Sequence, residues 1–149
     1  MTITDIMSLV ALITGTVGCV LSTLNFLYDR AKVVVSFQWD MKPWGNIPLD
    51  ENKLYGCISV TNVGRRPVFI SHASLKFPGH NKYGVLYEGL KGETLKEGDP
   101  PKRYPVSQEG LEEYSKDWSK IRGCVEDSTG KRYYSKPVLK QPSWAKTES

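Results

Sequence analysis

The segment IMSLVALITGTVGCVLSTLNFLY, residues 6–28, contains no charged residue and lies close to the start of the chain. Its 23 residues would form a helix about 34 Å long at roughly 1.5 Å per residue, and the hydrocarbon core of a bilayer is about 30 Å thick. We therefore predict a single transmembrane helix near the N-terminus, with residues 1–30 as the membrane anchor.

Three other interpretations of this segment make different predictions. A cleaved secretory signal carries Lys or Arg ahead of a short apolar stretch, but residues 1–28 contain neither, and Asp5 is their only charged residue. A lipoprotein signal would place a large aliphatic residue three positions before Cys19, where this chain has Thr16. A soluble core helix without a polar face is unusual in a chain of 149 residues. An uncleaved anchor is therefore the leading interpretation.

The distribution of basic residues predicts the orientation of the helix. All 20 Lys and Arg of the chain follow the apolar segment. Basic residues that flank a membrane helix stay on the cytoplasmic side, which predicts an outward N-terminus and a cytoplasmic domain at the inner membrane of the cell. Tyr28 would then lie at the interface of the bilayer as an anchor.

Small residues recur along the apolar segment at spacings of four, four and three: Ala11, Gly15, Cys19 and Ser22. On a helix they share one face, which would let a second copy of the chain approach closely and form a homo-oligomer. Small and hydroxyl-bearing residues are also common in membrane helices in general, and this alternative stays open.

Residues 29–149 have the length of one domain. They hold 20 basic and 15 acidic residues, a formal charge of +5, because Asp5 is the only acidic residue before them. These charges are dispersed, and the sequence shows no groove-reading helix, zinc spacing or aromatic-basic RNA signature. Nucleic acid is therefore not an expected partner.

Alternation of apolar and polar residues predicts strands through most of this domain. Between residues 33 and 40, Val35, Phe37 and Trp39 alternate with Ser36 and Gln38. Similar patterns, bounded by Gly and Pro turns, predict strands at residues 54–61, 68–77, 83–87, 94–96, 121–126 and 131–135. The sequence therefore predicts an all-β domain over residues 31–136, behind one N-terminal transmembrane α-helix.

Two segments depart from the strand pattern. Ser107 can cap a short helix in which Leu111, Tyr114 and Trp118 share one face, and we expect this helix as an insertion between strands. Residues 137–149 contain prolines among mixed polar residues, which predicts a loosely ordered tail.

Three segments carry a resemblance: VTNVGRRPVFI at residues 60–70, LKEG at 95–98 and DSTGKRY at 127–133. They resemble a group of small prokaryotic proteins in which a single N-terminal membrane helix carries an immunoglobulin-like β-sandwich of unassigned function. The resemblance implies an immunoglobulin-like β-sandwich with a short inserted helix. It also implies that the Asn62 side chain folds back on the backbone and that Gly64 takes the left-handed conformation.

Cys57 and Cys124 are 67 residues apart, which is similar to the spacing of the inter-sheet disulfide in immunoglobulin domains. However, the alternation places both on the polar faces of their strands, and Arg122 replaces the Tyr expected two residues before the second Cys. A cytoplasmic domain would also keep both thiols reduced. A disulfide and two free thiols therefore stay as alternative hypotheses.

Arg65 and Arg66 lie in a turn and are candidates for binding a phosphate, an anionic lipid headgroup or an acidic partner, although an exposed charged turn is also ordinary. His72 and His80 are the only histidines, and with the two cysteines of the domain they lack the spacing of zinc ligands. We therefore predict no metal site.

The sequence shows no Ser-His-Asp order, carboxylate pair or Gly-rich phosphate loop, so we expect neither catalytic residues nor a cofactor. We predict a membrane-anchored, non-catalytic interaction module that presents its β-sandwich to a protein partner. Two alternatives remain: a membrane-perturbing effector of a phage-related or antiviral system, and an envelope-facing binding domain if the topology is reversed.

Overall fold

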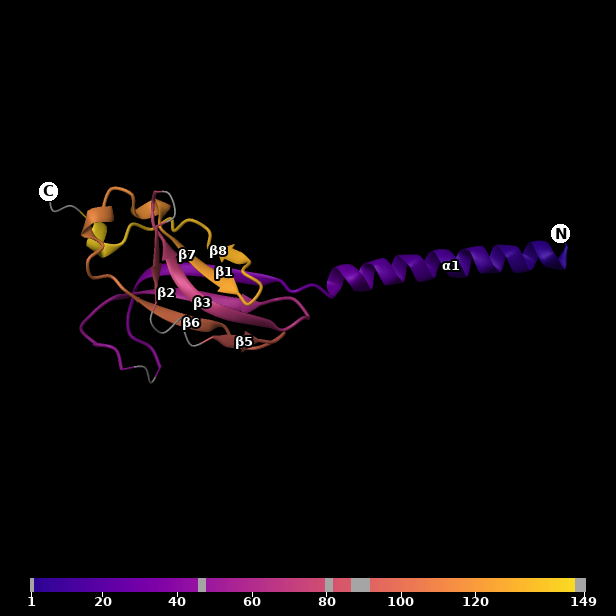
Figure 1. The fold of residues 1–149 in the computed structure, drawn as a ribbon, viewed down its shortest axis with the longest axis horizontal. Helices are drawn as coiled ribbons and strands as arrows, with labels where there is room; N and C mark the ends of the chain where they lie inside the picture. Colours follow the sequence, from indigo (N-terminus) through magenta and orange to yellow (C-terminus); the bar gives the residue numbers. More distant parts are fainter. Residues whose placement is uncertain (1, 46–47, 80–81, 87–91, 147–149) are drawn as a thin grey trace.

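The apolar segment forms one long helix, α1 (Ile3–Tyr28), which extends away from the rest of the molecule (Figure 1). The computed structural model describes residues 2–45, 48–79, 82–86 and 92–146. Thr2 caps the helix, since its hydroxyl accepts a hydrogen bond from the Asp5 amide at 3.3 Å and the Asp5 carboxylate accepts one from the Thr2 amide at 2.8 Å. No side chain of α1 is buried. The helix is long and apolar enough to cross a membrane, although a signal sequence would meet the same test.

Two antiparallel sheets follow the helix (Figure 1). The first has the strand order β1-β2-β6. In the second, β3 pairs with β7 along one edge and with β4 and β5 along the other, and β7 also pairs with β8. The strands are β1 (Val33–Met41), β2 (Tyr55–Asn62), β3 (Val68–Lys76), β4 (Tyr83–Val85), β5 (Glu93–Leu95), β6 (Lys102–Ser107), β7 (Arg122–Asp127) and β8 (Arg132–Tyr134).

The inner faces of the two sheets pack against each other around one core. Phe37 and Ile58 are buried from the first sheet, and Leu75 and Val125 from the second. Gly123 lies where the sheets approach closely: an added Cβ would be 3.1 Å from Cγ1 of Ile58 and 3.3 Å from Cβ of Phe37. The alternation predicted for β1 is confirmed, because every second side chain of its central part is buried in this core.

The sequence pattern does not predict strand β6, which is an edge strand of the first sheet. Tyr104 and Val106 of this strand are buried in the core. Lys102, Arg103 and Pro105 give the same segment the composition of a loop. Proline is tolerated here because an edge strand pairs on one side only.

An insertion between strands lies where the short helix is predicted after Ser107, but it is not one helix capped by Ser107. The segment forms two short 3-10 turns, η2 (Glu112–Tyr114) and η3 (Trp118–Lys120). Oγ of Ser107 accepts a hydrogen bond from the Glu109 amide at 3.2 Å, and Gly110 follows with a φ of +77°. The hydroxyl therefore closes a tight turn instead of capping a helix, and the left-handed glycine redirects the chain.

Part of the C-terminal segment predicted as a loose tail packs against the domain, and its last three residues lie outside the described part of the chain. The turn η4 (Ser143–Ala145) docks near the end of β1. The amide and hydroxyl of Ser143 donate to the Asp40 carboxylate at 2.8 and 2.6 Å. The Trp144 ring packs edge-on against Trp39, with centroids 5.3 Å apart. Individual side chains hold this segment, and such contacts leave no periodic signal in the sequence.

Candidate functional site

The turn between β2 and β3 is organised by one buried amide side chain. Nδ2 of Asn62 donates to the carbonyls of Arg66 and Leu95 at 2.7 and 3.0 Å, and Oδ1 accepts from the Gly64 amide at 3.0 Å. Asn62 is only 3% exposed. The expected fold-back of this side chain on the backbone is confirmed, and the side chain also ties β5 to the turn.

Gly64 has a different role from the one expected. It does not have a positive φ, so the left-handed conformation is wrong. A Cβ at this position would overlap the carbonyl oxygen of Arg30 and the amide nitrogen of Lys32. The amide of the neighbouring Val63 donates to the Lys32 carbonyl at 2.8 Å. Because Gly64 has no side chain, the linker between α1 and β1, residues 29–32, can pack directly against the turn.

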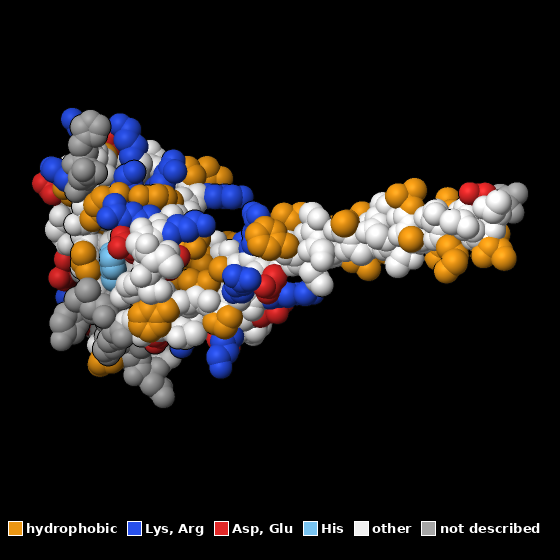
Figure 2. Space-filling model, turned by 45° about the vertical axis from the view of Figure 1, so that its right-hand side comes forward, with side chains coloured by type: hydrophobic (Ala, Val, Ile, Leu, Met, Phe, Trp, Pro, Cys, Tyr) orange, Lys and Arg blue, Asp and Glu red, His pale blue; other side chains and the backbone are white. Residues whose placement is uncertain are grey.

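The two arginines of this turn have different surroundings, at a junction where basic and acidic side chains gather (Figure 2). Arg66 donates through Nε and Nη2 to Oδ2 of Asp29, at 3.0 and 2.7 Å. Arg65 is exposed and forms no ion pair with any residue that the structure describes. With Asn25 and Phe26 it lines a cavity of about 350 Å³ beside the end of α1. Anion binding by the two arginines stays a prediction, and Arg66 already has a carboxylate partner.

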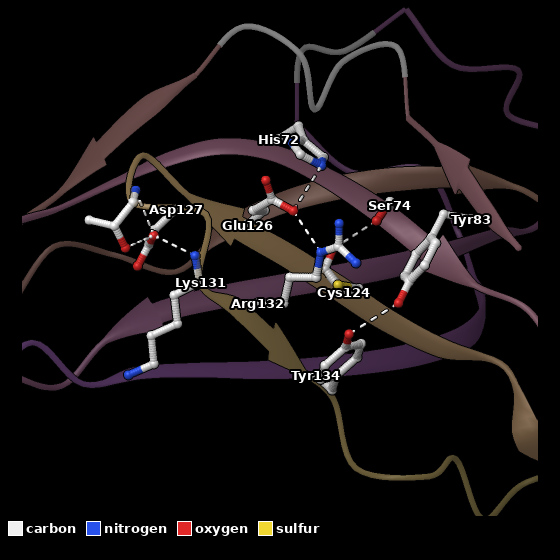
Figure 3. A network of polar contacts seen from close by, with 10 residues as sticks. His72, Ser74, Tyr83, Cys124, Glu126, Asp127, Lys131, Arg132 and Tyr134 are labelled. Carbon is white, nitrogen blue, oxygen red and sulfur yellow. Dashed lines mark hydrogen bonds and ion pairs between the residues drawn. The ribbon is translucent and has the colours of Figure 1, made fainter. Parts of the chain in front are cut away.

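A second polar cluster, the outer network, lies on the outward face of the five-stranded sheet (Figure 3). Strand pairing assembles it, because Glu126 on β7 lies opposite His72 on β3 and opposite Arg132 on β8. Sequence reasoning missed this cluster: its members come from four strands, and no local motif marks them. The outer network consists of His72, Tyr83, Glu126, Arg132 and Tyr134.

Arg132 is at the centre of the outer network. Its Nε donates to Oε2 of Glu126 at 2.7 Å, and Nε2 of His72 is 3.9 Å from the same oxygen. The guanidinium lies over the Tyr83 ring, 5.0 Å from its centroid, and the hydroxyls of Tyr83 and Tyr134 share a hydrogen bond of 3.1 Å. This shared bond lowers the pKa of Tyr83 and raises the pKa of Tyr134. An ion pair, a cation–π contact and a hydrogen bond between two hydroxyls therefore hold the cluster together.

Small side chains beneath the outer network leave room for it. Ser74 and Cys124 lie opposite each other on β3 and β7, and Tyr134 is the next residue along the same row, on β8. Both small residues are buried although they face outward. Tyr83 and Tyr134 meet above them (Figure 3).

The turn from β7 to β8 adjoins the outer network and is closed by a carboxylate (Figure 3). Oδ1 of Asp127 accepts from the amides of Thr129 and Lys131 at 2.8 and 3.0 Å and from the Thr129 hydroxyl at 2.6 Å, and Oδ2 accepts from the Tyr133 hydroxyl at 3.0 Å. Burial opposes ionisation of Asp127, but these hydrogen bonds outweigh it and lower the pKa. Burial and the neighbouring carboxylate raise the pKa of Tyr133 to about 12. Gly130 supplies the left-handed conformation that this turn needs, with a φ of +82°.

Cys57 and Cys124 are free thiols, which contradicts the disulfide hypothesis. Cys57 lies on the outward face of the first sheet, in a pocket with Gln38 and Arg103. Cys124 faces outward from the second sheet, so the two side chains point away from each other. Their predicted placement on the outward faces is confirmed, and burial raises the pKa of both thiols.

Among the described residues, no three side chains of His, Cys, Asp or Glu lie close enough together to hold a metal ion. His72 belongs to the outer network, and His80 lies outside the described part of the chain. The small residues predicted to form a helix contact face are all exposed on α1: Ala11, Gly15, Cys19 and Ser22.

Comparisons of the chain with protein-family models, with curated proteins and with solved structures found no match. The junction and the outer network are therefore interpreted from their geometry and chemistry.

Proposed function

We propose that the chain is a single-pass membrane protein whose β-domain lies on the cytoplasmic side and acts by binding, without catalysis. The helix supports the membrane part of this proposal, because its apolar side chains are exposed and such exposure is unfavourable in water. The hydroxyls of Thr14, Thr16 and Thr23 donate to carbonyls one turn earlier, at 2.9, 2.8 and 2.9 Å. A bilayer would therefore cover α1 without leaving these groups unpaired.

The strand order supports an immunoglobulin-like β-sandwich. In immunoglobulin domains strand B lies between A and E, and strand F lies between C and G. Here β2 lies between β1 and β6, and β7 lies between β3 and β8, in the same order along the chain. On the strands that correspond to B and F, Ile58 and Gly123 meet in the core while the cysteines face outward. We infer that apolar packing takes the place of the inter-sheet disulfide.

The outer network is the observation that carries the binding function. Tyr134 is 40% exposed, and Arg132 is exposed although Glu126 and Tyr83 hold its guanidinium in place. Tyrosine and arginine are enriched among the residues that dominate protein interfaces, and side chains that are already ordered lose less entropy on binding. The network is therefore suited to contact a protein partner at the membrane.

Photocrosslinking in intact membranes tests this assignment. A benzophenone amino acid at Tyr134 is expected to capture a partner protein, whereas the same amino acid at Ser36, exposed on the outward face of the other sheet, is not. In a chain carrying the probe at Tyr83, Arg132→Ala should lower the yield of adduct about tenfold. Equal capture from both sheets, or none at the network, would contradict the proposal.

Sidedness needs a new cysteine, because Cys57 and Cys124 are buried and would react slowly on either side of a membrane. We expect Ser128→Cys, in a chain without its natural cysteines, to be protected from a membrane-impermeant maleimide until the cells are opened. Labelling in intact cells would place the domain outside and favour the envelope-facing alternative. Loss of α1 from the mature chain would identify a signal sequence.

A further inference from the structure

A groove of about 460 Å³ lies at the end of the five-stranded sheet farthest from α1, and we call it the distal groove. The end of β3, the turn η3, the start of β7 and the end of β8 contribute its walls. Its main lining residues are Lys76, Phe77, Ser119, Lys120, Arg122 and Tyr134.

Three cations meet in the distal groove. Lys76 and Arg122 lie directly opposite each other in the register of β3 and β7, and like charges in such a pair destabilise a sheet. Lys120 joins them from η3, and none of the described lining residues is acidic. Among the described residues, two contacts offset this positive charge: an ion pair of Lys120 with Asp117 at 2.6 Å, and the position of the Lys76 ammonium over the Tyr134 ring, 5.0 Å from its centroid. The sheet therefore holds together positive charges that repel one another.

We propose that the distal groove binds a small soluble anion whose phosphate groups carry two or more negative charges. A phosphate group between Lys76 and Arg122 would offset their repulsion, and a guanidinium matches phosphate oxygens in a bidentate contact. Ser119 adds a hydroxyl donor at the rim. Phe77, which stacks on Tyr114 with centroids 4.7 Å apart, provides a fixed wall. The volume also falls within the range of about 300–1,000 Å³ that is common for ligand sites.

The position of the groove favours a ligand from solution over a membrane lipid. Strand β3 begins at Val68, beside the turn against which the linker packs, and ends at Lys76. Its 9 residues span about 30 Å, so a bilayer around α1 does not reach the groove. This exclusion rests on the proposed membrane anchoring, whereas the charge argument does not.

Calorimetric titration of the full chain in phosphatidylcholine nanodiscs with inorganic pyrophosphate tests the proposal. We expect saturable binding that weakens with added NaCl. The double variant Lys76→Gln/Arg122→Gln should bind about tenfold more weakly or worse. The matched control Lys96→Gln/Arg103→Gln removes the same charge from exposed positions outside the groove and should bind as the parent chain does.

Thermal unfolding of the same proteins separates loss of binding from loss of folding. Without ligand, the groove variant should unfold at or above the temperature of the parent chain, because its like-charge pair is gone. Pyrophosphate should raise the unfolding temperature of the parent and of the control variant only. Absence of binding, or equal weakening in both double variants, would overturn the proposal.

Two further arms test the class of ligand. Citrate that competes as well as pyrophosphate would overturn the preference for phosphate. Displacement of pyrophosphate by nanodiscs that contain phosphatidylglycerol would assign the groove to a lipid headgroup instead. A reversed topology in the labelling experiment would leave the titration valid, so the two proposals fail separately.

Discussion

The turn between β2 and β3 and the turn between β7 and β8 are each closed by one buried polar side chain, but only the side chain of the first turn bonds to another segment of the chain. Asp127 is 7% exposed and accepts four hydrogen bonds, all from residues 129–133. Asn62 contacts its own turn and also the carbonyl of Leu95, 33 residues away. The linker between α1 and β1 also packs closely against this turn at Gly64.

The chemistry of the two side chains accounts for the difference. A carboxylate only accepts hydrogen bonds, so it gathers the amide and hydroxyl donors of its own turn. An amide also donates, so it can bind carbonyl groups that belong to other segments. The Asp127 side chain therefore bonds only within its own turn, whereas the Asn62 side chain also joins its turn to β5.

The largest effect is expected from Gly64→Ala, which places a Cβ against the backbone of Arg30 and Lys32. Since backbone has to move, the free energy of unfolding should fall by about 3 kcal/mol. Gly130→Ala is the matched change in the other turn, where the space is open and only the positive φ is unfavourable, so it should cost about 1 kcal/mol. Chemical denaturation followed by tryptophan fluorescence measures both, and equal losses would remove the difference between the turns.

Asn62→Asp tests whether the donors of the amide matter. The carboxylate would keep the Gly64 amide as a partner but would leave the carbonyls of Arg66 and Leu95 without their donor. We expect a loss of about 2 kcal/mol in the free energy of unfolding. Hydrogen exchange should also become faster at the amides of β5. A variant as stable as the parent chain would show that water satisfies both carbonyls.

The reciprocal change, Asp127→Asn, should cost less, about 1 kcal/mol at neutral pH, because the amide retains one oxygen acceptor. It should also remove a pH dependence. The pKa of Asp127 in the folded protein lies below its usual value of 3.8, so its contribution is fully present above that pH. The contribution is lost as the pH falls from 3.8 through the folded pKa. Acid titration of both proteins measures it, and identical acid profiles would count against the role of Asp127.

The smallest effect is expected from Arg66→Gln. Its ion pair with Asp29 is more than half exposed on the arginine side, and such pairs contribute below about 1 kcal/mol. The loss should shrink further at 1 M salt, because exposed charges are screened. Denaturation at two salt concentrations measures the loss of stability. A large loss that persists in high salt would mean that the ion pair holds the linker more strongly than the close packing at Gly64 does.

Local patterns in the sequence predict local features of this fold. Alternation identifies β1 and the outward placement of Cys57 and Cys124, because each depends on residues that are neighbours in the chain. Strand β6 is not predicted, because Pro105 and two basic residues give this edge strand the composition of a loop.

The candidate sites depend on contacts that no local pattern records. Arg66 is identified from its turn, but its partner Asp29 is 37 residues earlier. The outer network needs the register of four strands before Tyr83 and Tyr134, 51 residues apart, can meet. Gly64 reads as a turn glycine, and only the approach of the linker shows why a side chain is excluded.

The close packing of the linker against Gly64 also has a mechanical consequence. A linker with free dihedral angles would absorb torque, and the domain would swivel independently of the helix. Here the linker is held by the close approach of Gly64, by the amide of Val63 and by the pair of Arg66 with Asp29. Rotation of α1 about its axis would therefore rotate the β-domain as well. The outer network and the distal groove would move around that axis together with the helix.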